Sequence, residues 1–107
     1  MAKQIKLMAE YTADVPLWWA DGEQVGFVNP VTLGLSDQLV GQLRAWNLRY
    51  RALLNRQDPA STPDMAVDDQ RQFEAEGHRL ARDLATFLGS TCKVQYFSQV
   101  ERRLLEF

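Results

Sequence analysis

Histidine and cysteine, which often bind metals or take part in catalysis, each occur once in this sequence. His78 is the single histidine, and Glu74 lies one helical turn before it. A glutamate and a histidine at this spacing could share a metal ion, but a metal site needs three or four ligands. The spacing therefore favours an ordinary ion pair on a helix surface.

Cys92 is the single cysteine of the chain. It could act as a nucleophile only if a base and a positive environment lowered the pKa of its thiol. It lies instead on the apolar side of an alternating segment, which predicts a buried and unreactive side chain. One cysteine cannot form an internal disulfide, and this is typical of a cytoplasmic protein.

Paired carboxylates, which general acid and base catalysis often uses, occur at Asp68 with Asp69 and at Glu74 with Glu76. Adjacent residues point in different directions on a helix, and acids are common in a first turn because the helix dipole favours them. Asp68 and Asp69 therefore indicate a solvated helix start. Glycine-rich phosphate loops, nucleophile elbows and cysteine clusters are absent from the sequence, so we expect no enzyme, cofactor or metal site.

One segment combines basic and aromatic side chains: Arg44, Trp46, Arg49, Tyr50, Arg51 and Arg56. Such a combination can bind single-stranded RNA when the aromatic rings are free to stack on bases. Here the aromatic residues share a helical stripe with Leu39 and Leu43, which predicts that they enter the core. The net charge is −2, so we expect no direct binding to nucleic acid.

Trp18 and Trp19 form the least ordinary pair in the sequence. Consecutive residues of a strand point to opposite faces, so both side chains cannot easily enter one core. Exposed tryptophan is enriched at binding hot spots. One of the two is therefore an interface candidate, or else Trp18 caps the core while Trp19 shields an edge of the sheet.

The composition, with 46% hydrophobic and 24% charged residues, is that of an ordinary globular protein. A length of 107 residues supports one core, so we expect a single domain over residues 1–107. No apolar run approaches the roughly 20 residues that cross a bilayer, and the first residues lack the regions of a secretory signal. We expect a cytoplasmic protein that does not bind membranes.

Three segments alternate between apolar and polar residues, which predicts strands at Gln4 to Tyr11, Gln24 to Val28 and Cys92 to Phe97. The first two could form a hairpin with a wide loop. The tail from Val100 to Phe107 fits a strand extension, a short helix or a docked tail.

Two further segments have helical periodicity. Ser36 can cap the first, which extends to about Gln57. The second begins near Val67, and Gly89 stands where a left-handed residue normally closes a helix. Gly77 lies on its apolar face and would let the first helix approach closely. The residues expected between the helices, facing Ile5, Leu7 and Val94 of the sheet, are Leu43, Trp46, Tyr50, Leu80 and Leu84.

The order strand, strand, helix, helix, strand predicts an α+β two-layer sandwich. Each strand has one polar face, so two antiparallel helices should cover one face of an antiparallel or mixed sheet of about three strands.

Several pieces of the sequence resemble a group of small bacterial proteins of about this length. They are the run from Ile5 to Tyr11, Pro16-Leu17-Trp18, Val25-Gly26, Leu35-Ser36, Trp46, Tyr50, Leu54-Asn55, Asp58-Pro59, the run from Phe73 to Gly77 and the run from Val94 to Phe97. The group is similar to the immunity partners of polymorphic and contact-dependent growth inhibition toxins. The resemblance implies a small acidic cytoplasmic domain that binds and neutralises a cognate toxin domain, and it transfers no binding residue.

The leading hypothesis is an immunity protein that occludes the active site of a toxin, often a nuclease, or an adjacent surface. A nuclease cleft is basic because it binds phosphates, so acidic residues would associate with it rapidly. The alternative is a small structural or regulatory protein-protein interaction module without a toxin partner, and an enzyme comes third. The residues expected to bind the partner are Trp18, Trp19, Asp58, Asp64, Asp68 and Asp69.

Overall fold

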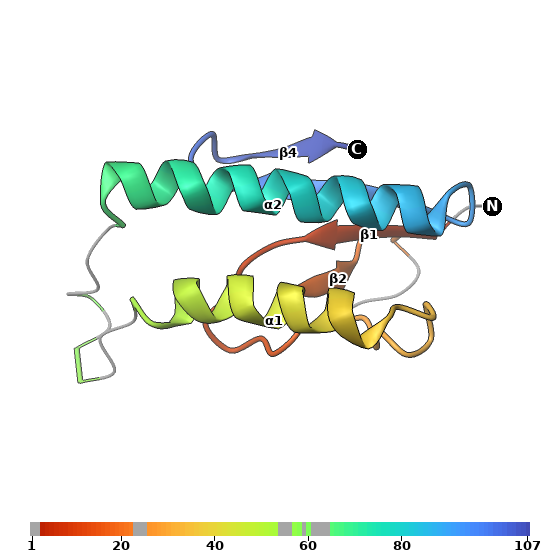
Figure 1. The fold of residues 1–107 in the computed structure, drawn as a ribbon, viewed down its shortest axis with the longest axis horizontal. Coiled ribbons are helices and arrows are strands. Elements are labelled where there is room, and N and C mark those ends of the chain that lie inside the picture. The colour runs from red at the N-terminus through yellow and green to blue at the C-terminus, as the bar shows by residue number, and fades with distance from the viewer. Residues whose placement is uncertain (1–2, 23–25, 54–56, 59, 61–64) are drawn as a thin grey trace.

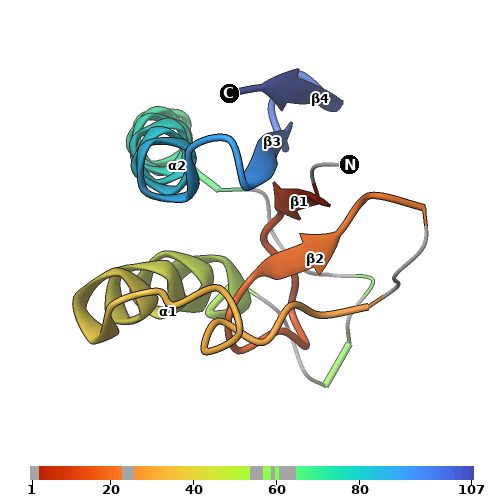
Figure 2. The same ribbon diagram turned by 90° about the vertical axis from the view of Figure 1, so that its right-hand side faces the viewer.

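The computed structural model describes residues 3–22, 26–53, 57–58, 60 and 65–107. In chain order their elements are β1 (Lys3–Leu7), β2 (Leu17–Trp19), α1 (Asp37–Arg51), α2 (Val67–Leu88), β3 (Cys92–Ser98) and β4 (Arg103–Glu106). The strands form one sheet in the order β2-β1-β3-β4, and both helices lie on the same side of it (Figure 1, Figure 2). The predicted α+β sandwich is confirmed, with four strands instead of about three.

The sheet is mixed because its two central strands run parallel. β1 pairs with β3 from Lys3 opposite Cys92 to Leu7 opposite Tyr96. The chain between these strands contains both helices, and such a crossover is what parallel pairing requires. The edge strands β2 and β4 pair antiparallel with β1 and β3.

The second strand differs from the sequence-based prediction. β2 is Leu17–Trp19 rather than Gln24 to Val28, of which residues 23–25 lie outside the described residues. Phe27 forms an isolated antiparallel bridge with Trp18. The three consecutive apolar residues of β2 have no alternation, so a periodicity criterion could not detect this strand.

Strand β1 ends at Leu7, before its predicted end at Tyr11, because a buried side chain holds the following backbone. The Asn47 side chain accepts a hydrogen bond from the Glu10 amide at 2.9 Å. It donates to the carbonyls of Glu10 and Ala13 at 3.1 and 2.7 Å. These bonds satisfy backbone groups that a longer strand would have paired with a neighbouring strand.

The helix ends follow the capping signals of the sequence more closely than the strands follow periodicity. The Ser36 hydroxyl accepts a hydrogen bond from the Leu39 amide at 3.2 Å, as predicted. Gly89 closes α2 with a φ of 57°. The first helix ends at Arg51, short of Gln57, and residues 54–56 lie outside the described residues. No helix among the described residues is both long and apolar enough to span a bilayer.

The tail after Val100 forms strand β4, so the first of the three alternatives left open by the sequence is the one observed.

The predicted core is largely confirmed. The fully buried members are Ile5, Leu7, Leu43, Trp46, Leu80, Leu84 and Val94. Tyr50 is partly buried and packs against this cluster.

Gly77 has a different role from the predicted one. A Cβ atom placed on it would lie 2.6 Å from Cε1 and from the hydroxyl oxygen of Tyr96. The missing side chain therefore admits the Tyr96 ring of β3, and not helix α1. Tyr96 is fully buried at this contact between α2 and the sheet.

We predict opposite effects for alanine at two helical glycines. Gly77→Ala should lower the free energy of unfolding by about 1–3 kcal/mol, because the methyl group overlaps the Tyr96 ring. Gly41→Ala is the matched control: a Cβ there meets nothing within 4 Å, and alanine should raise stability by about 0.5–1 kcal/mol. Urea denaturation of both variants checks this. Equal effects would contradict the proposed Tyr96 contact.

Candidate partner-binding site

The two tryptophans lie on opposite faces of the sheet. Trp19 shares a face with Ile5, its partner in β1, and packs against the core. Trp18 pairs with Lys6 on the face without helices. The structure thus contradicts the alternative in which Trp18 caps the core and Trp19 shields an edge. Trp18 is the tryptophan on the open face.

Trp18 is held in one orientation while part of its ring stays accessible. Its indole nitrogen donates to the Met8 carbonyl at 3.1 Å. The Trp18 ring packs on Phe27 with centroids 4.3 Å apart, and Phe27 is 51% exposed. The pair forms a fixed aromatic patch at the β2 edge of the sheet.

Two of the four acidic candidates lie at the start of α2. Asp68 and Asp69 are exposed in its first turn, and the N-cap residue Ala66 provides no side-chain hydrogen bond. Neither aspartate makes an ion pair within the described part of the chain. Asp58 is exposed, and Asp64 lies outside the described residues. The described acids therefore present negative charge to solvent at this end of the molecule.

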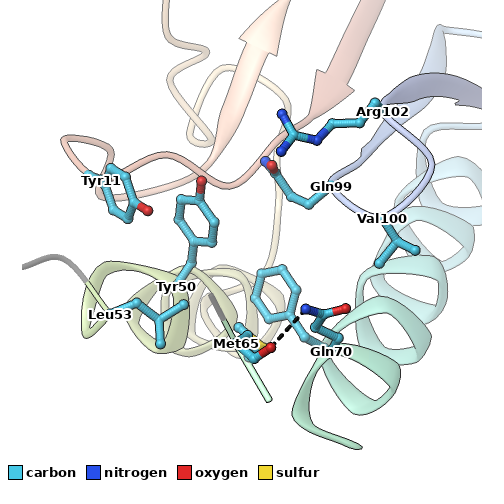
Figure 3. A pocket seen from close by; sticks show the side chains of 9 residues that line it. Tyr11, Tyr50, Leu53, Met65, Gln70, Gln99, Val100 and Arg102 are labelled. Carbon is cyan, nitrogen blue, oxygen red and sulfur yellow. Dashed lines mark hydrogen bonds between the residues drawn. The ribbon is translucent and has the colours of Figure 1, made fainter. Parts of the chain in front are cut away.

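Two adjoining cavities lie beside the start of α2. One of about 410 Å³ is lined by residues of both helices, of the loop after β1 and of the β3–β4 turn, including Tyr11, Tyr50 and Arg102 (Figure 3). The other, of about 320 Å³, includes Asp69. Both share Leu53, Met65 and Phe73 as walls. Neither cavity is lined by Trp18 or Trp19, so the acids and the tryptophans form two separate surfaces.

Tyr11 and Tyr50 form one side of the larger cavity, which we call the tyrosine pocket. Their rings stack with centroids 4.5 Å apart. Burial raises the pKa of Tyr50 to about 12, with the neighbouring Tyr11 as the next cause, while Arg102 acts in the opposite direction. This pocket could not be predicted from the sequence, because its lining residues come from segments far apart in the chain.

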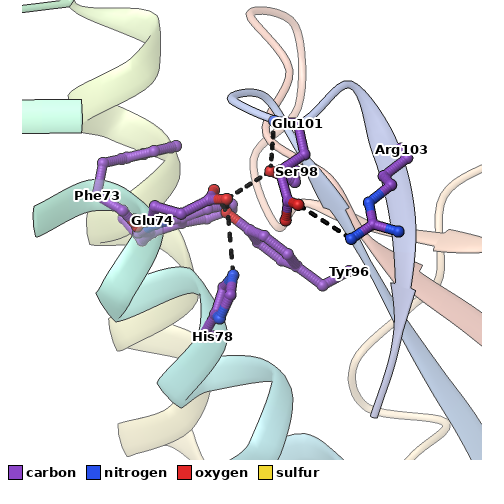
Figure 4. A network of polar contacts seen from close by, with 8 residues as sticks. Phe73, Glu74, His78, Tyr96, Ser98, Glu101 and Arg103 are labelled. Carbon is purple, nitrogen blue, oxygen red and sulfur yellow. Dashed lines mark hydrogen bonds and ion pairs between the residues drawn. The ribbon is translucent and has the colours of Figure 1, made fainter. Parts of the chain in front are cut away.

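A network of polar side chains joins α2 to β3 (Figure 4). Glu74 accepts hydrogen bonds from the Tyr96 hydroxyl at 2.5 Å and from the Ser98 hydroxyl. His78 lies 3.6 Å from the same carboxylate, as the predicted helix ion pair. Burial raises the pKa of Tyr96, with the hydrogen bond to Glu74 as the second cause. The described residues contain no group of three side chains suited to hold a metal ion.

Two of the three arginines of α1 are engaged in ion pairs. Arg44 contacts Asp14 at 3.0 Å, and Arg49 contacts Glu76 at 2.5 Å. Trp46 is 1% exposed and donates from its indole nitrogen to the Phe73 carbonyl at 2.9 Å. Its burial agrees with the prediction that this aromatic belongs to the core.

Cys92 is buried at the start of β3, as predicted. Burial raises the pKa of its thiol above the ordinary value, although Lys3 acts in the opposite direction. A raised pKa reduces the thiolate fraction, so this environment suits an inert side chain.

A family model described as Serratia CdiI immunity protein-like matches residues 3–99. No curated protein matches the chain.

The partly buried Tyr50 and the fully buried Tyr96 predict a loss of stability in alkali. Their pKa values are raised in the folded state, so the stability that depends on the neutral hydroxyls is complete below pH 10 and is lost as the pH rises through about 12 for Tyr50. Urea unfolding at several pH values should give a shallower decline for Tyr50→Phe than for the wild-type chain. Parallel declines would contradict the environment assigned to Tyr50.

Proposed function

The chain belongs to the Serratia CdiI immunity protein-like family, a family of contact-dependent inhibition systems, and we propose that it binds and neutralises a cognate toxin domain. The match over residues 3–99 carries this proposal. The chain would act in the cytoplasm as a non-enzymatic inhibitor, by covering the toxin active site or a surface beside it.

The proposed interface uses the acids near the start of α2 together with the aromatic patch at β2. Asp68 and Asp69 are exposed and have no ion-pair partner among the described residues, so partner binding would not break an existing contact. Trp18 adds an aromatic surface that is already fixed by its bond to Met8. An ordered aromatic contributes contact area with little loss of side-chain entropy on binding.

A nuclease domain is the proposed class of toxin. Its phosphate-binding cleft would be basic, and exposed carboxylates accelerate association with a basic surface. Asp58 and Asp64 belong to the same proposal as neighbours of Asp68 along the chain. We propose an indirect role for Trp19. It packs against the core and thereby supports the strand that carries Trp18.

The function is tested by growth. Cells that express the toxin domain encoded beside the gene for this chain should stop growing, and co-expression of the chain should restore growth. The two purified proteins should also form a complex with each other. Growth arrest that persists with abundant folded chain would refute the proposal.

We predict that Asp68→Lys with Asp69→Lys slows association with the toxin domain at least tenfold at low salt, an effect that shrinks as salt screens the charges. Stopped-flow fluorescence measures the rate. For the control, Asp37→Lys is compared with the single variant Asp69→Lys, because both add the same charge to the chain. Asp37 lies in the first turn of α1, at the opposite end of the molecule from the start of α2 (Figure 1). An equal loss in the control would mean that net charge alone governs the rate.

Trp18→Ala should act on dissociation instead. Removal of a central aromatic contact typically costs about 2 kcal/mol of binding or more, which corresponds to a dissociation rate roughly 30 times faster. Surface plasmon resonance would measure the rate, and circular dichroism would verify the fold. Unchanged dissociation of a folded variant would exclude Trp18 from the interface.

A further inference from the structure

Arg102 has an unusual backbone conformation. Among the described residues it is the only one other than glycine with a positive φ, at 58°. A residue with a Cβ atom is strained in this left-handed region, which glycine occupies without strain. An arginine at this position therefore lowers the stability of the fold relative to glycine. This strain leads us to look for a function of the side chain.

The turn that carries Arg102 is firmly anchored. Its amide donates to the Ser98 carbonyl at 2.8 Å. The Ser98 hydroxyl accepts from the Glu101 amide at 2.9 Å and donates to Glu74 of α2. These contacts fix the backbone of the β3–β4 turn on the helix layer, so Arg102 projects from a rigid base.

The guanidinium of Arg102 is directed into the tyrosine pocket. Figure 3 places it beside the Gln99 amide, and both face the Tyr50 hydroxyl. The adjacent Arg103 is paired with Glu101 at 3.0 Å, whereas Arg102 has no carboxylate within ion-pair distance among the described residues. Among the described residues, Arg102 is also the only charged side chain that lines this cavity.

We propose that the tyrosine pocket binds a carboxylate side chain of the protein partner, with Arg102 as the cation that pairs with it. This inference rests on the proposed function. It adds a positively charged contact, made by Arg102, to the negatively charged contact proposed for Asp68 and Asp69. A guanidinium binds a carboxylate in a planar, two-bond geometry. Amide and phenol groups of Gln99 and Tyr50 can supply further polar contacts, while Leu53, Met65 and Val100 provide apolar walls for the stem of the side chain.

A carboxylate suits the pocket better than a phosphate group does. Arg102 supplies one positive charge, which balances one carboxylate. A phosphate dianion would need further cations, and none of the described residues supplies a second one to the pocket lining. The stacked Tyr11 and Tyr50 rings also make part of the wall aromatic, so benzoate is a suitable small probe.

A titration tests the pocket without any toxin. Benzoate should shift the nuclear magnetic resonance signals of the Arg102 guanidinium and of both pocket tyrosines to saturation, and neutral benzamide should bind about tenfold more weakly. Arg102→Gln should remove the preference for benzoate, while Arg103→Gln retains it. Equal affinity for benzamide, a response centred on Arg103, or tighter binding of inorganic phosphate would each overturn the proposal.

The same variants separate a binding role from a structural one. Arg102→Gly should keep or raise the Tm, because glycine relieves the strained φ, yet it should weaken the complex with the toxin domain about tenfold. A Tm lowered by both Arg102→Gly and Arg102→Gln would show that the side chain supports the turn, and would overturn the proposal.

The growth assay distinguishes this inference from the proposed function. If the wild-type chain does not protect cells, the proposed function fails and the partner contact fails with it. If the wild-type chain protects and Arg102→Gln protects equally well at limiting expression, the proposed function stands and only the carboxylate contact is wrong. Loss of protection in Arg102→Gln but not in Arg103→Gln supports the contact.

Discussion

The contact between the Tyr96 ring and the bare backbone of Gly77 determines how the helix layer sits on the sheet. Tyr96 is fully buried on β3, one of the two central strands, and its hydroxyl donates to Glu74, one turn before Gly77. An aromatic ring can approach a helix this closely only where the side chain is missing. The ring also contacts Trp46 of α1 at a centroid distance of 6.1 Å, so one side chain sets the positions of both helices.

The tyrosine pocket depends on this arrangement and on the hydrogen bonds that the Asn47 side chain makes to the backbone after β1. Asn47 holds the chain after β1 against α1, which brings Tyr11 onto Tyr50. Glu74, already bound to Tyr96, also accepts the Ser98 hydroxyl at the base of the β3–β4 turn. The partly buried Glu74 carboxylate accepts from two hydroxyl donors, and the buried Asn47 amide has three backbone partners. Both side chains thus support the tyrosine pocket, although neither lines it.

The sequence correctly predicted the features that depend on interactions within one helical turn. Ser36 and Gly89 marked the helix ends, and the acids after Val67 marked an exposed helix start, because capping and the helix dipole act within one turn. β2 was missed because three apolar residues have no period, and the partner of Gly77 was misassigned because the glycine alone does not say which element approaches it. The tyrosine pocket was not predicted either. Its lining joins residues such as Tyr11 and Arg102, whose proximity depends on the tertiary fold.

The parallel pairing of β1 with β3 has a consequence for the order of folding. β1 is made first, but its neighbour in the sheet follows both helices in the chain. The helices can form early because their contacts are local, whereas the sheet must wait for a long loop to close. Until then, the apolar side of β1 has no covering layer, and a nascent chain is exposed to aggregation at this edge. We therefore expect one non-local strand pairing, rather than helix formation, to limit the rate of folding.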